Sequence, residues 1–340
     1  MADLRAGLLG VGMMGRHHAR VLRDVDGVDL VAIADPGGDP HGVAGGLEVL
    51  PDIDALIAAG IDIAVVAVPT RFHEDAALKL AEAGVHTLVE KPIAHNVEAG
   101  RRMTDAFASR GLIGAVGHVE RFNPALQEMR RRLEAGELGD VFQIATRRQS
   151  TFPARIADVG VAKDLASHDI DLTSWVAQSE YRTVFAQTAH RSGREFEDMI
   201  TVTGRLANGV IVNHLVNWLS PMKERMTVVT GERGSFVADT LTADLTYYVN
   251  GTISTEWDSV ANFRGVTEGD VTRLAIAKRE PLKVEHEAFR DAVLAARGEA
   301  PADSESGPAI VSMREGLNTL RVAEAMAASG REARTIRLQD

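Results

Sequence analysis

The chain has 340 residues and a net charge of −11, from 37 basic and 48 acidic side chains, so it has about twice the length of an ordinary domain and no basic excess for binding nucleic acid. The complete lack of cysteine excludes disulfide scaffolds, Cys-ligated zinc, iron–sulfur clusters and thiol catalysis. No apolar run reaches the roughly eighteen residues that span a bilayer, so we expect a cytoplasmic protein with neither a membrane nor a nucleic-acid partner.

The first predicted element is a strand over residues 4–9, followed by the turn Gly10-Val11-Gly12-Met13-Met14-Gly15 and a helix. In a G-x-G-x-x-G turn the first glycine allows a tight bend, the second lets the backbone approach a pyrophosphate, and the third allows close helix–strand packing. The helix N-terminus favours the negative charge of the pyrophosphate. His17 and His18 face apart on this helix, so we expect one to line the cofactor turn and the other to lie at the surface. The predicted cofactor contacts of the turn are Gly10, Gly12, Met13, Met14 and Gly15.

A second apolar strand over residues 29–34 ends in Asp35, twenty residues after Gly15. A carboxylate at this place hydrogen-bonds the adenosine ribose hydroxyls and repels a 2′-phosphate, which favours NAD over NADP. Alternatively, Asp35 only opens the turn before Pro36, and both roles can hold together. Residues 36–46 contain five glycines and two prolines, so we expect a loop in place of the usual crossover helix.

Further apolar runs alternate with helical patterns up to about residue 117. The predicted strands cover residues 61–68, 86–89 and 112–116, and the helices cover residues 72–83 and 96–110. Fully apolar strands that alternate with helices are typical of a parallel sheet covered on both faces, so we predict a doubly wound Rossmann domain over residues 1–120. Ligands of such sheets lie at the carboxyl ends of the strands. The residues there are Val68-Pro69-Thr70, Glu90-Lys91-Pro92 and His118-Val119-Glu120-Arg121.

After residue 120 the pattern changes to one helix followed by several strands. This change predicts an α+β domain over residues 121–340 with a large, mostly antiparallel open sheet. Asn123 is the predicted cap of the helix that runs to about Ala135, with Pro124 at its first position. The predicted strands cover residues 141–147, 182–188, 199–206, 210–216, 226–230, 235–238 and 245–249, and closing helices cover residues 282–296 and 308–328.

An open sheet of this size has one face for its own helices and another face that needs cover. Candidates for that second face are Thr201, Thr203, Val210, Val212 and His214. A partner subunit is the usual cover, so we expect a homo-oligomer, a dimer or a tetramer, formed through the C-terminal sheet.

Three side chains outside the glycine turn have the chemistry of a dehydrogenase. Asp164 and His168 are four residues apart, so on a helix they share a face one turn apart. A carboxylate beside a histidine raises its basicity and orients it to remove a proton from a hydroxyl. Lys91 follows a strand at the cofactor edge and could polarise the same oxygen. Together they suggest alcohol oxidation by hydride transfer.

Each of these residues has an alternative interpretation. His168 could fill or cap a helix, and Lys91 could be a solvated charge. His168 with Asp164, Asp169 and Asp171 could form a metal site of carboxylates and imidazole. We predict no metal, because Asp169 points away from the shared face and hydride transfer to a nicotinamide needs no ion.

These motifs resemble the glucose-fructose oxidoreductase, inositol dehydrogenase and MocA (Gfo/Idh/MocA) family. The glycine turn, Glu90-Lys91-Pro92 and the pair Asp164 and His168 occur in the family's order and cover nearly the whole chain. Residues 117–124, 160–165 and 280–285 are similar to the branch that oxidises nucleotide sugars, which includes UDP-N-acetylglucosamine 3-dehydrogenases.

The resemblance implies a role for each matching residue. Lys91 would contact the nicotinamide ribose and the reacting hydroxyl, His168 would be the acid–base group, and Asp164 would support it or hold a sugar hydroxyl. We expect the Lys91–Pro92 bond to be cis. Further implied cofactor contacts are Val68, Pro69, Thr70, His73, Glu90 and Glu120, and the implied substrate contacts are Lys91, Arg121, Asn123, Arg148, Lys163, Asp164 and His168.

A sugar diphosphate bound by an acidic protein needs local cations. The available basic cluster is Arg121, Arg147, Arg148, Arg155 and Lys163, for which the alternative is a solvated strand edge. We therefore predict an NAD-dependent dehydrogenase that oxidises a nucleotide-activated sugar, such as UDP-N-acetylglucosamine, at its 3-hydroxyl. The alternatives are a dehydrogenase or keto-reductase of a free sugar or polyol such as myo-inositol, and a dinucleotide-sensing regulator on the same fold.

Overall fold

The computed structural model describes residues 3–152, 159–251, 267–299 and 309–338, and the chain divides into two compact units. The first is Met1–Phe122 with Arg279–Arg321, and the second is Asn123–Lys278 with Val322–Asp340. The first has a six-stranded parallel sheet and the second a nine-stranded, mostly antiparallel sheet, which confirms the predicted fold class. Among the helices of the described residues, none is long and apolar enough to cross a membrane.

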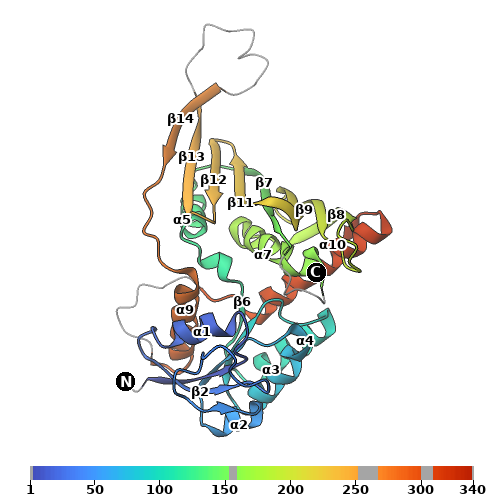
Figure 1. The fold of residues 1–340 in the computed structure, drawn as a ribbon. Coiled ribbons are helices and arrows are strands. Elements are labelled where there is room, and N and C mark those ends of the chain that lie inside the picture. The colour runs from blue at the N-terminus through green and yellow to red at the C-terminus, as the bar shows by residue number, and fades with distance from the viewer. Residues whose placement is uncertain (1–2, 153–158, 252–266, 300–308, 339–340) are drawn as a thin grey trace. The chain divides into compact units, whose positions relative to one another are not determined.

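The first sheet has the strand order β3-β2-β1-β4-β5-β6, with parallel pairing throughout (Figure 1). Its central strands are buried along almost their whole length, because apolar side chains of helices pack on both faces. The strands are β1 (Leu4–Leu9), β2 (Val28–Ala34), β3 (Val49–Leu50), β4 (Ile63–Val66), β5 (His86–Glu90) and β6 (Gly114–Gly117). The helices are α1 (Gly15–Leu22), α2 (Ile53–Ala58), α3 (His73–Glu82) and α4 (Val97–Ser109), with short 3-10 helices η1 (Thr70–Phe72) and η2 (Val119–Phe122).

The connection from β2 to β3 is a loop, as its glycine and proline content predicts. Residues 35–48 form turns and contain no helix. The sequence prediction missed β3 and α2, which have only two and six residues and therefore show no clear periodicity.

Helix α9 (Pro281–Ala296) belongs to the first unit although it comes late in the chain. Figure 1 shows it beside α1, and its Phe289 and Val293 pack in one apolar cluster with Leu8 and Leu22. Helix α10 (Met313–Glu332) contributes its residues up to Arg321 to the first unit and the rest to the second. The predicted second domain, residues 121–340, includes the α9 segment, so the division into folding domains stays a prediction.

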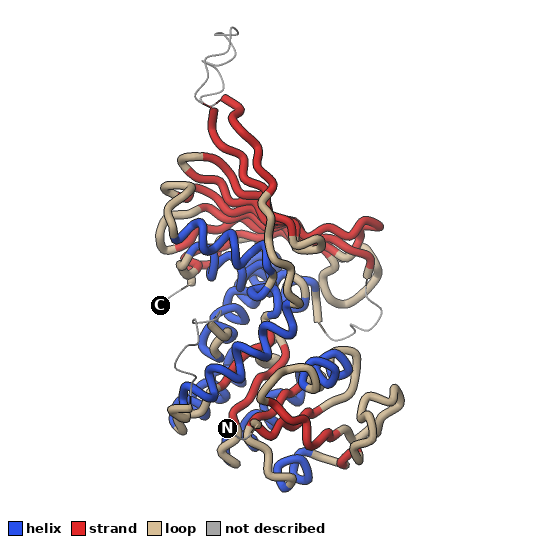
Figure 2. Tube along the Cα trace, turned by 90° about the vertical axis from the view of Figure 1, so that its left-hand side faces the viewer, coloured by secondary structure: helices blue, strands red, loops and turns tan. Residues whose placement is uncertain are grey.

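The second sheet has the order β14-β13-β12-β11-β7-β10-β9-β8-β15, and β7 with β10 is the one parallel pair among its described strands. Helices cover one face of it (Figure 2), and these helices are α5 (Pro124–Glu134), α6 (Val161–Asp164) and α7 (Ala166–Ala177). The strands are β7 (Val141–Thr151), β8 (Tyr181–Ala189), β9 (Met199–Leu206), β10 (Ile211–Asn217), β11 (Leu219–Gly231), β12 (Gly234–Asp239), β13 (Asp244–Gly251), β14 (Thr267–Arg273) and β15 (Ile336–Arg337). The prediction missed β14, which is largely polar, and β15, which has two residues.

Side chains alternate between the two faces of this sheet. Val210 and Val212 lie in the apolar core beneath it, and buried His214 is hydrogen-bonded there to the hydroxyl of Tyr181. The prediction that Val210 and Val212 line the open face is therefore wrong, whereas His214, although buried, is among the residues that line a hollow in that face. Thr201 and Thr203 do face the open side, where they line a hollow.

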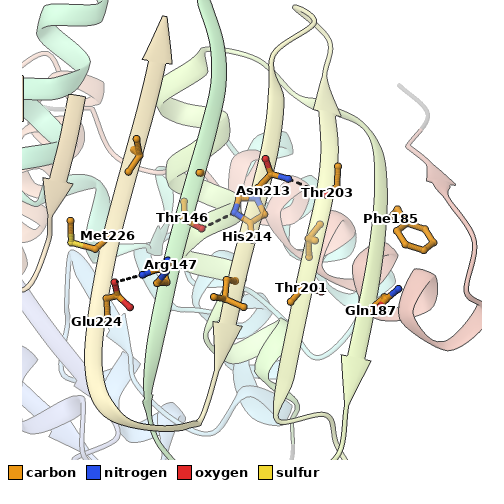
Figure 3. Close-up of a pocket in the computed structure, with 14 residues that line it drawn as sticks. Thr146, Arg147, Phe185, Gln187, Thr201, Thr203, Asn213, His214, Glu224 and Met226 are labelled. Atoms are coloured by element: carbon orange, nitrogen blue, oxygen red, sulfur yellow. Dashed lines mark hydrogen bonds and ion pairs between the residues drawn. The ribbon is translucent and has the colours of Figure 1, made fainter. Parts of the chain in front are cut away.

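The hollow in the open face has a volume of about 750 Å³ (Figure 3). Apolar side chains of Phe185, Leu215 and Met226 contribute to its lining. The guanidinium of Arg147 donates to Glu224 at 3.0 Å within it. This face thus combines apolar surface with paired charge.

We predict that Phe289→Ala destabilises the first unit by about 3–5 kcal/mol, because the ring is fully buried and its loss leaves a cavity. The free energy of unfolding is measured in urea. The matched control is Phe142→Ala, whose ring is 54% exposed and whose loss should cost less than about 1 kcal/mol. Equal unfolding free energies for the two variants would contradict the placement of α9 in that core.

Candidate functional site

The glycine turn after β1 is shaped by close backbone contacts. Gly10 has a φ of +97°, and a Cβ there would lie 2.6 Å from the carbonyl oxygen of Ala67. A Cβ on Gly15 would lie 2.0 Å from the oxygen of Gly10, so α1 can start this close to the strand only with glycine. A Cβ on Gly12 would meet nothing within 4 Å. The chain itself therefore leaves room beside Gly12, which is the space a pyrophosphate requires.

The start of α1 suits an anion. Its N-cap residue Met14 provides no side-chain hydrogen bond, and its first turn contains no acidic residue. Backbone N–H groups at such a helix start favour negative charge. The residues present thus fit the phosphate portion of NAD.

Asp35 ends β2 with its carboxylate fixed by two backbone donors. Its Oδ2 accepts from Val11 N at 2.9 Å and its Oδ1 accepts from Gly37 N at 2.7 Å. Its backbone oxygen also accepts from Gly38 N at 3.0 Å, so Asp35 does open a turn. Each carboxylate oxygen keeps a second lone pair, which is the capacity needed for ribose hydroxyls.

The turns after β4 and β5 are held together by His73. Its Nε2 lies 2.9 Å from the oxygen of Val68 and its Nδ1 lies 3.0 Å from the oxygen of Pro92. Burial lowers the pKa of His73, and the ring is only 1% exposed, so it supports these turns from inside the unit. The Lys91–Pro92 bond is cis, as predicted.

Glu90, at the end of β5, directs its carboxylate toward buried histidines. Its Oε1 accepts from His18 Nε2 at 2.8 Å, and its Oε2 accepts from the backbone N–H of Lys91 at 3.1 Å. The other ring nitrogen of His18 lies 2.8 Å from Nε2 of His286 on α9. His18 is fully buried, so it is not the surface member of the pair His17 and His18, and the place of one of them at the cofactor turn stays a prediction. Because Glu90 and His286 are 72 and 268 residues from His18 in the sequence, no local pattern predicts these contacts.

The residues that follow β6 are buried. Glu120 and Arg121 lie in η2, and Arg121 donates to Glu315 of α10 at 2.6 Å. Asn123 caps α5 as predicted, since its Oδ1 accepts from Ala125 N. Its amide also donates to the oxygen of Thr240 at 3.0 Å. These contacts give Arg121 and Asn123 structural partners within their own units.

Asp164 and His168 lie on helical backbone that is interrupted between them. Asp164 ends α6, His168 is in the first turn of α7, and Leu165 separates the two helices with right-handed dihedral angles. Asp164 is 9% exposed and His168 is half-buried. Within the described residues, no group of three or more His, Asp or Glu side chains could hold a metal ion.

Two basic residues predicted to contact the substrate, Arg148 and Lys163, are paired with acidic residues. Arg148 donates to Asp169 at 3.0 Å, and both side chains are 2% exposed. Lys163 donates to Glu324 at 2.9 Å, with its side chain 26% exposed. The pair Arg148–Asp169 therefore joins β7 to the first turn of α7, next to His168.

The predicted basic cluster does not form as a whole. Arg147 and Arg148 are neighbours on β7, so their side chains point to opposite faces of the sheet. Arg147 lies in the hollow of the open face, whereas Arg148 is buried beneath α7. Arg155 lies outside the described residues. The strand alternation alone was enough to separate Arg147 from Arg148.

Known protein families match both parts of the chain. Residues 4–118 match the oxidoreductase family with an NAD-binding Rossmann fold, GFO/IDH/MocA, and residues 126–237 match the GFO/IDH/MocA C-terminal domain. The NAD-binding match accords with the fit of the glycine turn.

Individual relatives include dehydrogenases of two substrate classes. The UDP-N-acetylglucosamine 3-dehydrogenase of Acidithiobacillus ferrooxidans is 31% identical over 302 residues, which are 87% of this chain and 91% of that protein. A solved structure of that enzyme superposes with a TM-score of 0.81 at 26% identity, covering 97% of this chain and 98% of that one. The inositol 2-dehydrogenase 2 of Saccharopolyspora erythraea is 33% identical over 221 residues, 62% of this chain and 65% of that protein.

We predict that Gly12→Val leaves the thermal unfolding temperature nearly unchanged but weakens NAD binding by tenfold or more, because its side chain fills the space beside the turn. Calorimetric titration measures the affinity. Gly15→Ala serves as the contrast, since its Cβ collides with Gly10 and should lower the unfolding temperature without NAD present. Wild-type affinity in Gly12→Val would rule out a cofactor at this turn.

Proposed function

The chain belongs to the GFO/IDH/MocA oxidoreductase family, and from this premise we propose that it is an NAD-dependent dehydrogenase that oxidises the 3-hydroxyl of a nucleotide-activated sugar such as UDP-N-acetylglucosamine. The observation that carries this proposal is the similarity to UDP-N-acetylglucosamine 3-dehydrogenase over nearly the full length of both proteins. Lys91, Asp164 and His168 supply the groups that such a reaction requires.

Oxidation of a secondary alcohol removes a hydride from carbon and a proton from oxygen. NAD, when bound, supplies the acceptor for the hydride. In our proposal His168 takes the hydroxyl proton as general base, and the ammonium of Lys91 donates a hydrogen bond to the same oxygen. Asp164 supports the imidazole of His168 or holds a neighbouring sugar hydroxyl.

The cofactor contacts divide into direct and supporting residues in this proposal. Direct contact falls to the glycine turn, to Asp35 and to the partly exposed turn Val68-Pro69-Thr70. His73 and Glu90 support those turns, because their side chains are buried and bonded within the first unit. For Glu120 we retain the proposal that its side chain lies near the nicotinamide.

A free polyol such as inositol is the second candidate substrate. One observation favours it: the two arginines proposed for a diphosphate, Arg121 and Arg148, are buried and paired with Glu315 and Asp169. The similarity to an inositol 2-dehydrogenase also favours a free polyol as substrate. Lys163 is also paired, with Glu324, but its side chain is 26% exposed.

We expect NADH formation, followed by absorbance, with NAD and UDP-N-acetylglucosamine in the presence of a ketone-trapping reagent. UDP-glucose, the corresponding uronates and myo-inositol complete the panel. His168→Ala should lower kcat by about 10²–10⁴-fold, because the proton acceptor is lost. His190→Ala, at an exposed histidine, is the control and should keep wild-type kcat. If no compound of the panel led to NADH formation while NAD still bound, both substrate classes would be contradicted.

We also propose that the open face of the second sheet joins a second copy of the chain. Among the described residues, helices cover one face of that sheet, and the hollow on the other face carries the apolar side chains Phe185, Leu215 and Met226. An apolar patch on an open sheet face is the kind of surface that a second copy of a chain covers in a symmetric dimer.

We expect the mass of the protein in solution, measured by light scattering, to be a multiple of 36.6 kDa. Leu215→Arg should shift it toward the monomer, because it adds a charge in the hollow. Leu241→Arg, at an exposed leucine that does not line the hollow, is the control. A monomeric wild type, or an unshifted mass for Leu215→Arg, would contradict this interface.

A further inference from the structure

A row of buried titratable side chains ends on the backbone of Lys91. His286 Nε2 lies 2.8 Å from His18 Nδ1, and His18 Nε2 lies 2.8 Å from Glu90 Oε1. The other oxygen of Glu90 accepts from the N–H of Lys91 at 3.1 Å. His286, His18 and Glu90 are 2%, 0% and 8% exposed. We name these three residues the histidine–glutamate row.

The charges along the row follow from its surroundings. Burial alone would raise the pKa of Glu90, but the hydrogen bond from His18 and the nearby positive charges hold it below its usual value. Glu90 is therefore an anion and accepts from His18. Burial, with the neighbouring His18, lowers the pKa of His286 well below its ordinary value, so His286 is neutral. The contact between the two histidines then holds a single proton between ring nitrogens.

The carboxylate of Glu90 has little freedom to move. On the neighbouring strand, a Cβ at Gly117 would lie 3.3 Å from the carboxyl carbon of Glu90, so the side chain packs against bare backbone. One oxygen is taken by His18 and the other by the N–H of Lys91. A displacement of the carboxylate would therefore break or strain its contact with the residue that carries the proposed catalytic ammonium.

Burying the three side chains of the histidine–glutamate row costs more free energy than filling the same space with apolar side chains. A buried carboxylate and two buried imidazoles lose hydration that apolar side chains would not lose, and pairing does not in general repay that cost. Buried polar groups that are fully bonded do fix one arrangement of their neighbours. Here the fixed neighbour is the turn that carries Lys91 at the end of β5.

We propose that His18 and His286 are positioning residues for Lys91, acting through Glu90, so that helix α9 is part of the catalytic architecture. This inference rests on the proposed function, since it assigns Lys91 to the chemical step. The row holds the backbone N–H of Lys91 and keeps a fixed anion beside its side chain. Neither histidine touches substrate in this role.

The first test separates positioning from filling of space. His286→Leu removes the ring nitrogen that contacts His18, whereas His286→Gln places an amide near the same position. We expect His286→Leu to lower kcat tenfold or more, because the network that fixes the Lys91 turn loses one of its contacts. The KM for the sugar and the Kd for NAD should stay within about threefold, and His286→Gln should restore kcat to within about threefold of wild type. His190→Leu, at an exposed histidine, is the control.

A second readout needs no substrate. The amide proton of Lys91, bonded to Glu90, should exchange slowly in NMR, and its exchange should become at least tenfold faster in His286→Leu but not in His286→Gln. If the wild-type protein turned over no substrate, the proposed function would be contradicted, but the exchange of the Lys91 amide proton would still test the positioning role. Wild-type kcat in His286→Leu, unchanged amide exchange, or equal loss of kcat and thermal stability in both variants would overturn the positioning role.

Discussion

The turn from β1 into α1 is the constraint on which the first unit depends. Gly15 approaches the carbonyl of Gly10 too closely for any side chain, so only glycine lets the turn after β1 lead into α1 with this close packing. His18, one turn further along α1, is thereby fixed against the end of β5, where Glu90 lies. The same turn thus makes room for a pyrophosphate on one side and anchors the Lys91 segment on the other.

Each unit contains one buried charged contact adjacent in sequence to a proposed catalytic residue. Glu90 with His18 precedes Lys91, and Asp169 with Arg148 follows His168. Such contacts contribute little net stability, since desolvation offsets most of their attraction, but they resist rearrangement because breaking one leaves a buried charge alone. Both proposed reactive side chains therefore project from backbone that has one favoured arrangement.

Local features were predictable from the sequence and distant pairings were not. The strand–turn–helix at Gly10, the cap at Asn123 and the loop predicted from residues 36–46 depend on neighbours within a few positions, and all three are confirmed. The row from His286 to Glu90 depends on α9 returning to the first unit, which no local pattern encodes. The opposite directions of Arg147 and Arg148 follow from strand alternation, which the prediction of one basic cluster left out.

The arginine pairings bear directly on the substrate. A diphosphate that bound Arg148 would have to displace Asp169 from a contact that is 2% exposed, and would leave that carboxylate buried without its partner. Arg121 differs, because its partner Glu315 is 43% exposed and can be hydrated if released. Releasing Arg121 from its partner would therefore leave a carboxylate that water can reach, whereas releasing Arg148 would not. The buried pair is better suited to holding the start of α7, and with it His168, in place whichever sugar is oxidised.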